Sequence, residues 1–204
     1  QLDAALIARN SAMEVEAHLD GKLKPNDVAA HLTVQVPKLD WQSMKLMDVP
    51  FRTSHKLDVA FVSDLNQRYV VDASMTGTTV QTPKKTFNTK DLYMGFATSS
   101  DSTSAYMRAG DLDVNFEGRG YVEDMLRQLD AFTARAGEQW TSKTIVQEEL
   151  RQLLPGMCFK ATSGHDNPIS NYLSMMQGIS FDKLQMDFDT SPEEGINGEA
   201  YLYH

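Results

Sequence analysis

Four short segments of the chain repeat one alternation of side chains: Leu, any residue, Val or Met, any residue, Phe. Successive side chains on a β-strand point to opposite faces, so each copy predicts a strand with one buried face. Two such matches could arise by chance, but four in 204 residues favour a repeating β-layer. The copies are Leu57-Asp58-Val59-Ala60-Phe61, Leu92-Tyr93-Met94-Gly95-Phe96, Leu112-Asp113-Val114-Asn115-Phe116 and Leu184-Gln185-Met186-Asp187-Phe188.

Three further segments in the first half show the same period of two. They run from Ser11 to Asp20, from Leu32 to Val36 and from Tyr69 to Met75. Residues that favour turns separate the strands, and these are Asn10, Asp20-Gly21, Pro25-Asn26, Asp64 to Asn66 and Gly77. We therefore expect the first ~120 residues to form an antiparallel meander with one apolar face and one polar face.

The pattern changes to helical spacing after Gly120. Apolar residues from Tyr121 onwards predict a helix that ends near Gly137, and a second stripe predicts a helix from about Thr141 to Leu154. Pro155-Gly156 ends that helix, because proline cannot continue it. A short strand is expected over 157–162. Asn167-Pro168 then reads as an N-cap followed by proline at the first helical position, opening a third helix that ends at Gly178.

Together these elements predict an α+β fold. We expect a curved, mainly antiparallel meander with two to three amphipathic helices in the C-terminal half, packed on one face because an apolar stripe must bury against something. The chain is read as a single domain over 1–204, divided into a meander (1–119), a helical insertion with one strand (120–178) and a closing β-hairpin (179–204). The two closing strands are expected over 179–189 and 198–204.

Charge and composition narrow the classes of partner. The 19 Lys plus Arg against 28 Asp plus Glu give a net charge of −9 and no basic cluster, which argues against nucleic acid. A single cysteine, Cys158, forms no internal disulfide and is expected to be a plain thiol. No apolar run approaches the ~18 residues of a membrane span. Because the chain opens at Gln1, we expect a mature form or a piece of a longer protein.

Sequence signatures of catalysis are absent, and we expect no catalytic residue, metal or cofactor. The densest polar stretch, residues 163–167, could hold an anion or use His165 for proton transfer, but a turn and helix cap is the simpler interpretation. Four aspartates alternate with apolar residues and fit the solvated face of strands better than a paired-carboxylate site. They are Asp111, Asp113, Asp187 and Asp189.

Residues ~90 to 204 resemble the AsmA-like proteins of Gram-negative envelopes, which are relatives of the TamB translocation and assembly proteins. The segments that carry the resemblance are 110–116, Leu153-Leu154-Pro155-Gly156-Met157, Gly164-His165-Asp166-Asn167-Pro168, Ile179-Ser180-Phe181, Asp189-Thr190-Ser191-Pro192 and Gly195-Ile196-Asn197-Gly198. The strands before residue 90 agree in style without a specific motif.

The resemblance implies a long periplasmic protein, anchored by a membrane helix outside this chain, whose stacked strands form a groove with an apolar inner face. Such proteins act without covalent chemistry in outer-membrane assembly and in phospholipid transport between membranes. It thus implies phospholipid or fatty acyl chains, and envelope proteins, as partners. The expected contact surface, either a lipid groove or a covered core, consists of Leu57, Val59, Phe61, Leu92, Met94, Phe96, Leu112, Val114, Phe116, Leu184, Met186 and Phe188.

Two other classes of function stay open at this stage. A surface-exposed module that binds carbohydrate or protein would need an exposed aromatic platform, for which the candidates are Trp41, Trp140, Tyr201 and Tyr203. A hydrolase would use His165 with a carboxylate. What separates the leading hypothesis from a mere structural spacer is whether the apolar strand face is open or sealed by the helices.

Overall fold

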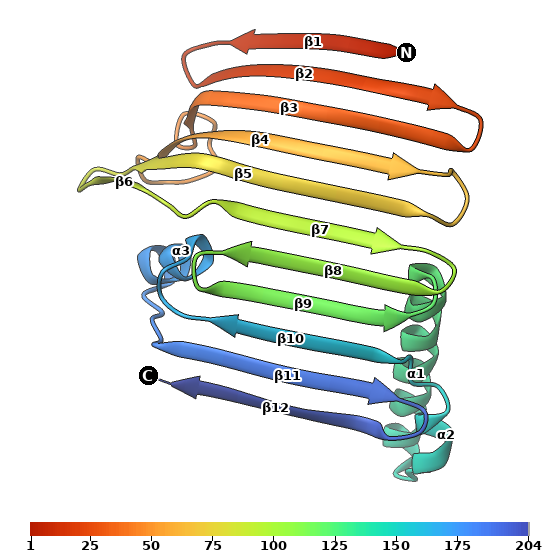
Figure 1. The fold of residues 1–204 in the computed structure, drawn as a ribbon. Helices are drawn as coiled ribbons and strands as arrows, with labels where there is room; N and C mark the ends of the chain where they lie inside the picture. The colour runs from red at the N-terminus through yellow and green to blue at the C-terminus, as the bar shows by residue number, and fades with distance from the viewer. Residues whose placement is uncertain (204) are drawn as a thin grey trace.

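The computed structural model describes residues 1–203, apart from the side chain of Met176, and one open antiparallel sheet dominates it (Figure 1). The strands pair in chain order from β1 to β12, except that β6 pairs only with β5 and lies off this path. The mainly antiparallel meander expected from the alternation is therefore confirmed. Its strands are β1 (Leu2–Arg9), β2 (Met13–Lys24), β3 (Asp27–Asp40), β4 (Arg52–Ser63), β5 (Tyr69–Gln81), β6 (Thr86–Asn88), β7 (Leu92–Thr98), β8 (Ser102–Ala109), β9 (Leu112–Arg119), β10 (Met157–Ser163), β11 (Lys183–Ser191) and β12 (Gly195–Tyr203).

Three helices interrupt the second half of the chain: α1 (Val122–Ser142), α2 (Gln147–Arg151) and α3 (Pro168–Gln177). The prediction that the first helix ends near Gly137 is wrong, because α1 continues through it to a left-handed Lys143. A glycine inside a helix costs only about 1 kcal/mol, so it need not end one. Thr141 consequently belongs to α1, and α2 is a short helix of five residues.

Two predicted turns lie inside strands. Asp20-Gly21 belongs to β2, which runs on to Lys24, and the turn comes at Asn26 with a positive φ of 59°. Gly77 lies inside β5 with a φ of +62°, where its backbone N–H donates to Asp91 Oδ1 and the pairing with β4 is irregular. The left-handed backbone marks a local irregularity here, not the end of the strand.

The remaining differences concern strands that the pattern did not reveal. Strand β1 has apolar residues on both faces, and strand β8 is rich in Ala and Ser, so the alternation of hydrophobicity is weak in both. Strand β11 begins at Lys183 instead of residue 179, and β12 begins at Gly195 instead of residue 198. His204, with which the predicted closing strand ends, lies outside the described residues.

The sheet forms an unusually open molecule. Its accessible surface is 13,140 Å², against about 9,600 Å² expected for a folded monomer of this mass. Few apolar side chains are fully buried, because all the strands belong to one layer. Among the described residues the buried apolar side chains are Val36, Val80, Ala109, Leu112, Met125, Leu154 and Ala161.

Candidate functional site

The strand pairing brings all twelve predicted contact residues to one face of the sheet, which we call the apolar face. Residues that pair directly across neighbouring strands share a face. Phe61 pairs with Val71, and Val71 pairs with Phe96, so the first two repeats are aligned through the strand between them. The same alignment continues through Ala105 to Phe116.

The central residues of the four repeats fall into one line across the sheet, which we call the middle row. It crosses eleven strands without a polar residue. Its members, in order from β1 to β12, are Ala4, Leu19, Leu32, Val59, Ala73, Met94, Met107, Val114, Ala161, Met186 and Ala200.

A second line, the Phe row, runs beside the middle row and includes the last residue of each repeat. Two glycines are its only members without an apolar side chain. It consists of Leu2, Gly21, Ala30, Phe61, Val71, Phe96, Ala105, Phe116, Phe159, Phe188 and Gly198. The predicted contact residues came only from β4, β7, β9 and β11, so the contributions of β1, β2, β3, β5, β8, β10 and β12 were missed. Partners in register with the repeats could have revealed those of β5 and β10.

Most side chains of the two rows are half-buried, and the face opens further toward the sheet edges. In the middle of the sheet Val59, Met94 and Val114 are half-buried. On the two edge strands Leu6 is 62% exposed and Leu202 is 64% exposed. At a strand spacing of about 4.8 Å, the rows form an apolar stripe roughly 50 Å long.

Helices α1 and α3 each have a contact with a residue near the end of a strand. Helix α1 crosses the ends of β8–β12, and α3 lies at the opposite ends (Figure 1). The buried side chain of Met125 in α1 lies against Gly118, where an added methyl group would overlap its sulfur. In α3 the hydroxyl of Ser170 lies 3.4 Å from that of Ser163 on β10. Gly118 is the next-to-last residue of β9, and Ser163 is the last residue of β10.

The opposite face of the sheet is polar and carries ion pairs between neighbouring strands. His31 Nε2 lies 2.7 Å from Asp58 Oδ1, and this hydrogen bond raises the pKa of His31 and lowers that of Asp58. Lys160 pairs with Asp187 at 3.3 Å. Asp113, Asp187 and Asp189 are on this face, as predicted for a solvated strand surface. The same prediction is wrong for Asp111, which lies in the turn between β8 and β9.

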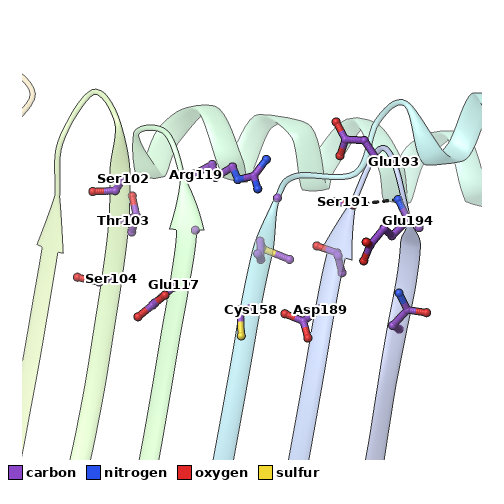
Figure 2. A pocket seen from close by; sticks show the side chains of 16 residues that line it. Ser102, Thr103, Ser104, Glu117, Arg119, Cys158, Asp189, Ser191, Glu193 and Glu194 are labelled. Atoms are coloured by element: carbon purple, nitrogen blue, oxygen red, sulfur yellow. Dashed lines mark hydrogen bonds between the residues drawn. The ribbon is translucent and has the colours of Figure 1, made fainter.

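A cleft of about 820 Å³ opens on the polar side where β8–β12 end (Figure 2). Cys158 and Asp189 line it, and their possible ligand atoms lie within 4.8 Å of each other and of a carboxylate oxygen of Asp187, which does not line the cleft. Burial and the hydrogen bond with Asp189 raise the pKa of the Cys158 thiol, which favours its protonated form. Asp187 also forms an ion pair with Lys160. The group is therefore a poor thiolate ligand set, and a protonated thiol is a weak nucleophile.

The polar stretch at 163–167 forms a helix cap, as the simpler interpretation predicted. Asn167 Oδ1 accepts from the backbone N–H of Ser170, and the Asn167 amide donates to Asp111 Oδ1 at 2.8 Å. Burial acts to raise the pKa of Asp111, but hydrogen bonds led by that of Asn167 outweigh it and lower the pKa. His165 is exposed, and Asp166 pairs with Lys90 at 3.0 Å. The acidic neighbour of His165 is thus held by a lysine.

The aromatic candidates for a binding platform come from different elements. Trp41 donates to Thr53 Oγ1 and packs edge-on against Phe51, whereas Trp140 is exposed on α1. Only Tyr201 and Tyr203 share a strand and a face, the polar face of β12.

No family model, curated protein or solved structure matches the chain. The resemblance to AsmA-like proteins consequently stays a prediction. None of the helices in residues 1–203 combines the length and the apolar character that a bilayer crossing requires.

Proposed function

We propose that this chain is a non-enzymatic periplasmic domain that holds acyl chains of phospholipids on its apolar face, in outer-membrane assembly or lipid transport between membranes. The observation that carries the proposal is the middle row, an apolar line across eleven strands that no second layer of the described residues covers. Exposed apolar areas of this extent are typical of interaction sites.

The dimensions of the stripe suit acyl chains. A stripe of roughly 50 Å exceeds the ~30 Å hydrocarbon thickness of a bilayer, so extended chains can lie along it end to end. Each methylene group removed from water contributes about 0.8 kcal/mol, which makes a chain of ordinary length a favourable ligand without any polar anchor. A surface that only buries methylene groups discriminates between acyl chains by their length and does not discriminate between headgroups.

In this proposal, the helices bound the apolar stripe at the strand ends. We place α1 and α3 on the apolar side, over the two ends of the strands, where they bound the curved stripe and leave its middle open. Met125 of α1 and Ser170 of α3 supply the contacts that support this placement. In the parent protein, a membrane anchor outside this chain would hold the domain in the periplasm.

The test uses two neighbouring positions on β11 that face opposite sides. Met186 belongs to the middle row, whereas Gln185 points to the polar face. Met186→Glu puts a carboxylate on the stripe, and Gln185→Glu adds the same charge on the other face. Binding of a dansyl-labelled fatty acid, followed by fluorescence, should weaken about tenfold or more in the first variant and less than about twofold in the second.

Native mass spectrometry of the gently purified chain gives an independent readout, in which a phospholipid or fatty acid should accompany the protein. Equal loss of the labelled fatty acid in both variants would show that charge alone, and not the apolar face, governs binding. A chain that binds neither probe contradicts the proposal.

One alternative has an observation of its own. Tyr201 and Tyr203 are both exposed on the polar face of β12, as a surface-exposed module that binds carbohydrate or protein requires. Ligand binding that falls with Tyr201→Ala and is unaffected by Met186→Glu would favour this alternative.

A further inference from the structure

Strand β1 forms one edge of the sheet and has no neighbour on its outer side among residues 1–203. Open edges of natural sheets are usually protected by proline, a bulge or an inward-pointing charge. Within Leu2–Arg9 there is no proline or lysine, and the pairing with β2 runs through all eight residues without a shift. Its backbone N–H and C=O groups on the outer side are therefore available to another strand.

The sequence of β1 complements itself when two copies run antiparallel. With Leu6 opposite the partner's Leu6, Ala4 lies opposite the partner's Ala8 and Ala5 opposite the partner's Ile7. Asp3 then lies opposite the partner's Arg9, and symmetry provides this pair twice. Every pair joins residues of the same face, so the hydrogen-bonding pattern of an antiparallel ladder is satisfied across the junction.

The other edge strand lacks this complementarity. Full antiparallel overlap of β12 with a second copy would place Glu199 opposite the partner's Glu199. Asp187 on the adjacent strand pairs directly with Glu199 and adds further negative charge on the same face. Like charges directly opposite each other destabilise a strand pair, so the charges favour association through β1.

We propose that two copies of this chain join through their β1 strands into one continuous antiparallel sheet. The two-fold axis stands perpendicular to the sheet at Leu6, and it keeps both apolar faces on the same side. Leu6 and Ala8 then connect the stripe of one copy to that of the other, which doubles its length. The proposal does not depend on lipid binding, because it rests on the edge, the register and the charges of β1.

A charge exchange between the two chains tests this pairing. Asp3→Arg sets guanidinium groups opposite each other in a homodimer, and Arg9→Asp sets carboxylates opposite each other. Sedimentation velocity should show the unaltered chain as a species of 45.6 kDa, twice its 22.8 kDa, and a dissociation constant about tenfold or more higher for each variant alone. An equimolar mixture of the two variants should restore the dimer, since only the mixed pair places opposite charges together.

Two controls separate this dimer from other outcomes. Arg9 also contacts Glu14 and Glu16 within its own chain, so Leu6→Lys serves as a second variant that disrupts the junction and leaves those ion pairs in place. Glu199→Arg on β12 should leave association unchanged, as should Met186→Glu. A mixture that remains monomeric, a response to Glu199→Arg, or open-ended assemblies larger than two copies would overturn the proposal.

Discussion

Asn167 is fully buried, at 0% exposure, and uses both ends of its side-chain amide. The oxygen caps α3, while the nitrogen donates to Asp111 and to the carbonyl of Gly164 at 3.0 Å. Asp111 follows Gly110 in the β8–β9 turn, so one amide joins the start of α3 to a turn 56 residues away in sequence. The cap was predictable from Asn167-Pro168, whereas the partner was not, because no local pattern marks Asp111 as an acceptor.

This position supports a prediction on stability. Asn167→Ala removes the cap and leaves Asp111 without its amide donor, so the free energy of unfolding should fall by about 2 to 3 kcal/mol in urea denaturation. Ser174→Ala, at an exposed position of the same helix, is the matched control and should change it by less than about 0.5 kcal/mol. A similar small effect of both substitutions would mean that water replaces the lost contacts.

At the scale of elements, alternation predicted strands well where large apolar residues repeat and poorly elsewhere. The four Leu-x-(Val or Met)-x-Phe segments lie in β4, β7, β9 and β11, as expected. Strands β1 and β8 were not predicted, because β1 is apolar on both faces and the Ala and Ser of β8 give little contrast between faces. Only pairing with β2, β7 and β9 reveals these two strands. The end of α1 was predicted wrongly because Gly137 is exposed and contacts nothing that would oppose a helix there.

The attachment of α1 to the sheet depends on few contacts, which makes one of them testable. Met125 is 4% exposed and lies against Gly118, whereas the adjacent Leu126 is 55% exposed. Met125→Ala should lower the free energy of unfolding by about 2 kcal/mol or more and increase amide exchange throughout α1. Leu126→Ala should leave both unchanged within about 0.5 kcal/mol. Faster exchange in α1 for both variants would indicate that the helix is held by contacts other than Met125.

At the scale of the molecule, the sequence could not determine whether the apolar face is open. The apolar stripes of the predicted helices favoured a cover, and a cover would have produced an ordinary buried core. In the structure α1 exposes Leu126 and Trp140, and the accessible surface exceeds the expectation for a compact monomer by about 3,500 Å². Where a helix lies over a sheet depends on connections and end contacts, such as Met125 on Gly118, that the period of hydrophobicity does not encode.

A single-layer sheet also predicts a gradient of stability across the molecule. Along the path from β1 to β12 each strand is held by two neighbours, except β1 and β12, which are each held by one; β6 lies off this path and pairs only with β5. Hydrogen exchange followed by mass spectrometry should therefore show protection rising from both edges toward β5 and β7, with edge amides exchanging about tenfold or more faster than central ones.

The Leu6→Lys variant is the right reference for this measurement, because pairing between copies would protect β1. Adding the fatty acid should raise protection in the central strands and keep the order from edge to centre. Uniform protection from β1 to β12 would show that the sheet opens in one cooperative step, and an open layer held only by neighbouring strands could not produce that result.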